Sequence, residues 1–346
     1  MNSKPQHVVI AGLPDAAHST VAGLADVFNV IPDLRAFDDA MPATRPFRVS
    51  VAGAGDSRDA ALPFRVERNI GEIDDADIVI VPSLMVSTTE WRPGGLPQVV
   101  EWLKAMHAKG ATLCSACSGG LLLAETGLLR DSEATTHWAY AGLFRRHFPD
   151  VRLRLEHLLV QTGQHRELVM SGASGSWTDL ALYLVSRTAG IAAAQAVAKF
   201  MLLEWHVDGQ LPFFSFLPVR DHRDAVIRDA QEWLDSHLDV SNPVDTMTCK
   251  SGLPPRTFKR RFARATGYSP IQYVQQLRIE AAKRRLERTA AAVDEVASQV
   301  GYEDAAFFRR LFKRVTGISP SAYRRKLQLP GYARQPFGAT KSAGKT

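Results

Sequence analysis

The stretch FKRRFARATGYSPIQY, residues 258–273, returns fifty positions later, without a gap, as FRRLFKRVTGISPSAY, residues 308–323. Nine of the sixteen positions are identical, including two phenylalanines, a Thr-Gly pair and a Ser-Pro pair. Chance seldom aligns so many Phe, Gly and Pro residues in one register. The two stretches therefore predict two copies of one small helical unit.

The parts of a helix-turn-helix unit can be separated within each copy. The two phenylalanines of a copy are four residues apart and share one helix face, which we expect to be buried. Thr-Gly stops that helix, and Ser-Pro begins the next, with Ser as N-cap and Pro at the first helical position. A shorter helix and a turn precede each copy, at 244–255 and at 293–304. A helix, a tight turn and a helix with exposed arginines are typical of helix-turn-helix units.

A longer helix, residues 271–288, is expected to join the two units. Its buried side is predicted to carry Val274, Leu277, Ala281 and Leu286. A further helix at 225–238 should open this second part of the chain, and residues 328–346, rich in Pro, Gly, Ser and Lys, are expected to be a disordered tail.

Positive charge is concentrated in the repeated region. Residues 250–327 hold eighteen Lys and Arg against six Asp and Glu, a net charge of +12, in a chain whose total is +6. A basic module on a mildly acidic body favours a polyanionic partner. The alternative is a solvated helix surface, but here the charges fall inside a repeated motif.

Residues 221–327 resemble the DNA-binding domain of the AraC/XylS family of bacterial transcription regulators. The motif runs from Gly301-Tyr302 through Phe308, Phe312, Gly317 and Ser319-Pro320 to Tyr323-Arg324, and the first unit follows it with Gly252-Leu253, Arg256, Phe258, Arg260, Phe262, Gly267, Ser269-Pro270 and Tyr273. The resemblance implies two helix-turn-helix units, each with one recognition helix in the major groove. It implies DNA contacts from Arg256, Lys259 and Arg260 in the first unit and from Ala306, Arg309 and Arg310 in the second.

The first part of the chain alternates strands and helices. Strands are expected at 7–13, 47–52, 77–82, 111–114, 158–161 and 168–170, and helices at 19–30, 96–109, 119–126, 177–188 and 190–209. The run Asp77-Ile-Val-Ile-Val-Pro82 is typical of a central parallel strand covered on both faces. We therefore expect an α/β open parallel sheet in a domain at 1–210, followed by a linker at 211–220.

The segment Leu113-Cys-Ser-Ala-Cys-Ser-Gly-Gly120 ends one predicted strand and opens a helix. A cysteine at such a turn lies at a helix N-terminus, where backbone N–H groups favour the thiolate. Its small neighbours permit the sharp turn of a nucleophile elbow. A buried, inert cysteine is the commoner alternative.

The wider pattern, from Cys117 to Leu129 and then Ala134 to Trp138, resembles the class I glutamine amidotransferase-like (PfpI-type) domain, which forms the N-terminal half of one AraC-family branch. The resemblance implies a flavodoxin-like sheet. In enzymatic relatives the cysteine at position 117 is the nucleophile, supported by a carboxylate after the first strand. Thr20 falls at that carboxylate position here, so we expect no catalysis, with Cys117 and His137 as vestigial groups. Thr20, Cys117, Ser118 and His137 are expected to line a pocket for a small effector.

Three hypotheses follow. The first is a ligand-responsive transcription regulator, an activator and homodimer through residues 1–210, with double-stranded promoter DNA and RNA polymerase as partners. The second is a thiol-dependent hydrolase or amidotransferase tethered to DNA. The third is a redox sensor that uses Cys114 and Cys117.

The composition also bears on membrane contact, cellular location, disulfides and metal binding. No apolar run reaches the roughly 18 residues of a membrane span, and the N-terminus shows no cleavage site, which predicts a cytoplasmic protein without membrane contact. Three cysteines do not suggest a disulfide scaffold. The cysteines and His137 lack the spacing of metal ligands, so we expect neither a metal nor a cofactor.

Overall fold

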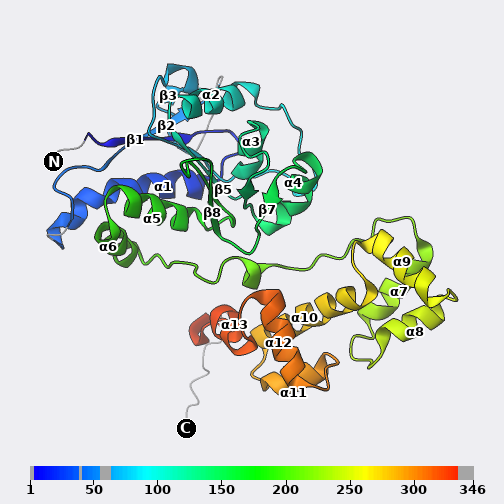
Figure 1. Ribbon diagram of the computed structural model, residues 1–346. Coiled ribbons are helices and arrows are strands. Elements are labelled where there is room, and N and C mark those ends of the chain that lie inside the picture. The colour runs from blue at the N-terminus through cyan, green and yellow to red at the C-terminus, as the bar shows by residue number, and fades with distance from the viewer. Residues whose placement is uncertain (1–3, 39–40, 55–63, 334–346) are drawn as a thin grey trace, which may run out of the picture. The chain divides into compact units, whose positions relative to one another are not determined.

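The computed structural model describes residues 4–38, 41–54 and 64–333 (Figure 1). Contacts divide the chain into two compact units, Met1–Gln210 and Leu211–Thr346. Among the described residues, no helix combines the length and the apolar content that a membrane span requires.

The first unit is built on a seven-stranded sheet with the order β3-β2-β1-β4-β5-β9-β8. The strands are β1 (Gln6–Ala11), β2 (Phe47–Gly53), β3 (Arg68–Asn69), β4 (Ile78–Val81), β5 (Thr112–Ala116), β8 (Leu159–Thr162) and β9 (Leu168–Ser171). All neighbouring pairs are parallel except β8 and β9, which a short turn joins as an antiparallel hairpin. The expected parallel α/β sheet with flavodoxin-like strand order is confirmed, with one antiparallel strand at its edge.

Helices cover both faces of this sheet. Figure 1 shows α1 (His18–Val30), α5 (Trp177–Thr188) and α6 (Ile191–Met201) on one side and α2 (Pro97–Ala108) on the other. The central strands are buried apolar runs because they are covered in this way; every residue of β4 is buried. The helix α3 (Gly119–Glu125) follows β5 directly.

Some elements of the first unit were not expected from the sequence. They are η1 (Ile31–Ala36), η3 (Ile70–Glu72), η4 (Trp138–Tyr140), α4 (Ala141–His147) and a small sheet of β6 (Glu133–Ala134) and β7 (Arg152–Leu153). The predicted helix at 190–209 is wrong beyond Met201. Leu202 adopts a left-handed conformation that ends α6. The Asp179 carboxylate then accepts the backbone N–H of His206 and lies 2.7 Å from its Nδ1, which holds the following segment outside any helix.

The second unit contains seven α-helices in its described part. They are α7 (Ala225–Asp235), α8 (Pro243–Lys250), α9 (Pro255–Thr266), α10 (Pro270–Arg288), α11 (Val293–Gln299), α12 (Ala305–Thr316) and α13 (Pro320–Leu327). The helix predicted at 225–238 ends three residues earlier. Of the tail predicted at 328–346, the first residues include a short 3-10 helix, η6 (Gly331–Ala333), and residues 334–346 lie outside the described part.

The repeat in the sequence is a repeat in the packing. The rings of Phe262 and Tyr273 meet edge to face at 5.2 Å, and those of Phe312 and Tyr323 do so at 5.3 Å. Both Gly267 and its counterpart fifty residues later end their helices with a φ of +79°. Each serine of the Ser-Pro pairs caps the next helix through its side chain. Two separate hydrophobic clusters result, one for each unit of the repeat.

The long helix α10 passes from one cluster to the other. Val274 is buried in the first cluster, and Ile279, Ala282 and Leu286 are buried in the second. Of the predicted buried side, Val274 and Leu286 are buried, and Leu277 and Ala281 are half-buried against the first and the second cluster. The buried residues of α10 shift from one side of the helix to another along its length, because the two clusters lie on different sides of it.

Candidate nucleic-acid interface and ligand site

The predicted DNA-contacting residues of the first unit share the outer side of α9. Phe258 and Phe262 are fully buried and form the inner side of the helix, which faces the core. Arg256, Lys259 and Arg260 are all exposed within its first two turns. Side chains in the first turns of a recognition helix are the ones that reach base edges in the major groove. Two guanidinium groups and one ammonium group here can bind guanine edges or phosphates.

The second recognition helix, α12, also exposes its predicted DNA-contacting residues, but their side chains differ from those of α9. Ala306, Arg309 and Arg310 are exposed. Asp304 caps the helix, with Oδ1 accepting the backbone N–H of Ala306 at 2.7 Å. Arg309 forms an ion pair with Asp294 on α11, so its guanidinium group is already held by the protein. Of the two arginines predicted to contact DNA from α12, Arg310 is therefore the better candidate for base contact.

Cys117 lies at the sharp turn between β5 and α3. It has a φ of +54°, uncommon for a residue with a side chain, and is only 2% exposed. Thr136 Oγ1 donates to the Cys117 carbonyl at 2.9 Å, and the Cys117 backbone N–H donates to Ser171 O at 2.8 Å. These contacts hold the strained turn. The Sγ atom lies 3.3 Å from Ser174 Oγ.

The surroundings of this thiol favour its neutral form. Burial raises the pKa of Cys117, and hydrogen bonds from Ser174, Ser118 and Ser83 lower it by less. Burial also raises the pKa of Cys114, which is completely enclosed. A thiolate is the nucleophilic form of cysteine, so this burial disfavours the form that would attack a substrate.

His137 is not arranged as a base for Cys117. Its Nδ1 accepts the backbone N–H of Ala139 at 3.1 Å, and burial lowers its pKa. In the part of the chain that the structure describes, no hydrogen bond joins His137 to Cys117. Thr20 is 1% exposed, and its hydroxyl has no hydrogen-bond partner among those residues. Within the same part, no group of three His, Cys, Asp or Glu side chains could hold a metal ion.

Comparison with known proteins identifies the domain type of the second unit. Residues 248–326 match the family model described as a helix-turn-helix domain. The HTH-type transcriptional regulator GbdR of Pseudomonas aeruginosa is 23% identical over 213 residues, which cover 60% of this chain and 56% of that protein. The second unit is an AraC-type helix-turn-helix domain. The matched part spans little more than half of GbdR.

Two further similarities involve other kinds of protein. Isonitrile hydratase of Pseudomonas putida is 31% identical over 101 residues, which cover 29% of this chain and 41% of that protein. The crystal structure of Drosophila melanogaster DJ-1beta is 19% identical, with a TM-score of 0.46, and covers 58% of this chain and all of that one.

The segment predicted as the linker, residues 211–220, packs onto the AraC-type domain. Phe216 is buried, and its ring meets those of Tyr268 and Tyr273 edge to face, at 5.3 Å in each case. Two residues earlier in the chain, the carbonyl oxygen of Phe214 accepts a hydrogen bond from Lys283 Nζ. The linker therefore contributes an aromatic side chain to the core of the first helix-turn-helix unit.

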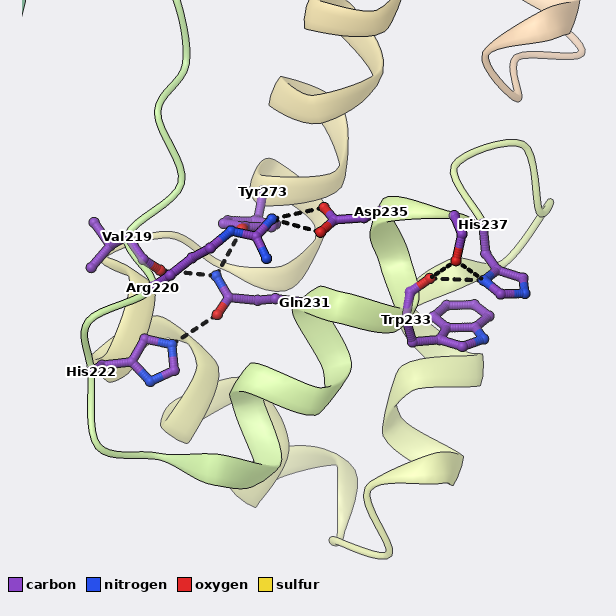
Figure 2. A network of polar contacts seen from close by, with 9 residues as sticks. Val219, Arg220, His222, Gln231, Trp233, Asp235, His237 and Tyr273 are labelled. Atoms are coloured by element: carbon purple, nitrogen blue, oxygen red, sulfur yellow. Dashed lines mark hydrogen bonds and ion pairs between the residues drawn. The ribbon is translucent and has the colours of Figure 1, made fainter.

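Polar contacts hold the end of the linker (Figure 2). Gln231, fully buried on α7, donates to Val219 O at 3.0 Å and to Tyr273 Oη at 2.7 Å, and its Oε1 lies 2.8 Å from the ring of His222. Arg220 adds a bidentate ion pair with Asp235, at 2.8 and 2.7 Å. A buried glutamine with both ends engaged fixes the linker in one position on the AraC-type domain.

A cavity of about 380 Å³ lies in the first unit where the strand order reverses between β1 and β4. Ligands of open α/β sheets bind at such a point. The cavity is lined by Leu13, Pro14, Asp15, Leu84, Val86, Ser87, Glu90, Trp91, Arg92, Gly95, Leu96 and Leu122. None of the four predicted effector residues is among them. Ser118 lies directly behind, since its Oγ donates to Leu84 O and accepts the Leu84 N–H.

Sequence reasoning also missed the residues that connect Cys117 to the end of the first unit. Gln210, only 1% exposed, donates from Nε2 to Thr136 O at 2.9 Å, and its Oε1 accepts the Trp138 N–H. Thr136 in turn holds the Cys117 carbonyl. In the sequence, the Gly-Gln pair at 209–210 is the one signal of this connection, and it does not show which residues Gln210 contacts.

Proposed function

We propose that this chain is a transcription regulator that binds promoter DNA through its AraC-type domain and a small effector through its first unit. The observation that carries the proposal is the pair of equivalent helices, α9 and α12, each with an aromatic core face and exposed arginines. Recognition helices joined by one rigid helix suit two major-groove segments about 34 Å apart. The net charge of the domain suits contact with phosphates.

The effector is proposed to occupy the cavity between β1 and β4, with Ser118 behind it. The buried hydroxyl of Thr20, which has no partner in the described chain, supports a polar ligand in the first unit. The contacts from Cys117 through Thr136 to Gln210 lead to the start of the docked linker. We infer that occupation of the cavity changes how the linker holds the AraC-type domain. A homodimer through the first unit, activation through RNA polymerase and a cytoplasmic location remain predictions.

Selection from a random duplex library tests the DNA-binding part of the proposal. The full chain should enrich sites with two conserved elements about one helical turn apart. A thermal-shift screen of small metabolites tests the other part, because a ligand of the native first unit must raise its unfolding midpoint. A library without enrichment after repeated rounds would contradict the DNA-binding proposal.

A thiol enzyme is the second candidate, supported by the left-handed conformation of Cys117 and the similarity to isonitrile hydratase. The burial and raised pKa of this thiol argue against it. We predict that iodoacetamide at neutral pH modifies the native chain at Cys249, the exposed cysteine, and leaves Cys114 and Cys117 unmodified.

Peptide mass spectrometry after short labelling measures this directly. Denatured protein, in which all three cysteines react, is the control for detection, and Cys249→Ser should leave the native chain almost unlabelled. Rapid labelling of Cys117 would favour the enzyme or the redox sensor. Insensitivity of operator binding to peroxide in the Cys249→Ser variant would exclude the redox sensor.

A further inference from the structure

Phe307 is a large apolar side chain exposed on the recognition helix α12. Its neighbour Phe308 is fully buried, whereas Phe307 is 38% exposed. The ring of Phe307 rests against that of Tyr302, with centroids 5.9 Å apart, and so has one supported face and one open face. The remaining exposed positions on this helix are mostly arginine, lysine and alanine. Because it lies in the first turns of the recognition helix, this ring is among the side chains that can reach base edges.

The ring is held in place before any partner arrives. Asp304 Oδ1 accepts the backbone N–H of Phe307 at 3.0 Å, which fixes the first turn of α12. Behind the ring, Tyr302 is itself covered by the Arg278 guanidinium, 5.1 Å from the ring centroid. That guanidinium donates to Leu238 O and to Val240 O, at 2.8 and 2.6 Å. An apolar group so positioned loses little conformational entropy on binding.

Helical spacing places Phe307 beside the arginine that we expect to contact bases. Arg310 follows three residues later, so the two side chains lie on adjacent turns of one face. Ala306, also exposed, leaves room next to the ring. Arg309 points elsewhere, toward its ion pair with Asp294. In its first turns, α12 therefore offers the guanidinium group of Arg310 next to an apolar ring.

We propose that Phe307 reads the C5-methyl group of a thymine adjacent to the guanine bound by Arg310. This inference rests on the proposed DNA-binding function. The thymine methyl is the one apolar group that base pairs present in the major groove, and phenylalanine contacts it. The equivalent residue of the first unit is Thr257, which is half-buried and much smaller. The second unit therefore selects thymine more strongly than the first.

Removal of that methyl group alone tests the proposal. Sites are first selected by the full chain, and the half-site read by α12 is identified as the one whose selection Arg310→Ala relaxes. Each thymine in that half-site is then replaced by deoxyuridine, which lacks only the methyl group. We expect a loss of about fourfold in affinity at one position, the factor for one buried methyl-sized group. Phe307→Ala should bind the two duplexes equally, and Phe307→Leu should keep part of the discrimination.

Ile271→Ala is the matched control, because Ile271 is also an exposed apolar residue, 53% exposed, but lies on α10. It should keep the full preference for thymine. Circular dichroism of each variant checks that the domain is folded. Binding that ignores the methyl at every thymine, a half-site without thymine, or unchanged discrimination in Phe307→Ala would overturn the role of Phe307 and leave DNA binding intact. Failure to enrich any duplex would overturn both.

Discussion

Replacing Arg260 and Arg310 together by alanine should weaken specific binding to an operator duplex by about 2–6 kcal/mol, the sum of about 1–3 kcal/mol for each side chain. The two arginines occupy equivalent exposed positions on α9 and α12. Their helices pack into separate hydrophobic clusters, so the two losses should add. This corresponds to a decrease of roughly thirtyfold to more than ten-thousandfold in affinity.

Gel-shift titrations of the single and double variants at one salt concentration measure this effect. The control replaces Arg145 and Arg146 by alanine, which removes the same charge from an exposed part of α4 in the first unit. Its specific affinity should match that of the wild-type chain. Equal affinity of the Arg260/Arg310 variant and this control would show that the recognition helices have been assigned wrongly.

Phe216→Ala should lower the free energy of unfolding of the AraC-type domain by about 3–5 kcal/mol, as is typical when a buried phenylalanine is truncated. The side chain lies against the rings of Tyr268 and Tyr273, so its truncation would leave a gap beside them. Tyr273 is fully buried and engaged by Gln231. The linker would then be a structural part of the domain.

Hydrogen exchange of the full chain, resolved by peptide, measures this loss where it occurs. Amides of α7 and α10 should exchange faster in Phe216→Ala, and those of the first unit should not change. Leu217→Ala is the adjacent control, because Leu217 is 70% exposed and its truncation should cost within about 0.5 kcal/mol. If the two variants exchange alike, the linker does not pack onto the domain in solution.

The helix-turn-helix repeat could be predicted because its signals are local. Phenylalanines four residues apart set the buried face of α9 and of α12, and glycine at 267 and 317 sets where each helix ends. The linker could not be predicted in the same way. Pro212 and Pro218 identify a non-helical segment, but the partners of Phe216 lie more than fifty residues further along the chain. The helix expected at 190–209 was too long for a related reason, since the contact of His206 with the distant Asp179 leaves no signal in the local sequence.

The ligand site was predictable only in part. The small residues around Cys117 indicate a sharp turn, and the structure has one there. Ser83 and Ser174, which surround the thiol, come from loops that no motif connects to it. The cavity at the switch point is lined by apolar and charged residues of the segments after β1 and β4, whose approach only the strand order determines.

Salt dependence of duplex binding tests the central claim most directly. The association constant of the full chain for its selected duplex is measured between 50 and 200 mM NaCl. If α9 and α12 enter successive major grooves and the domain contacts six or more phosphates, log K should fall linearly with log salt, by roughly a thousandfold or more over this range. Binding that does not change with salt, or no binding to any duplex by a folded chain, would contradict the account.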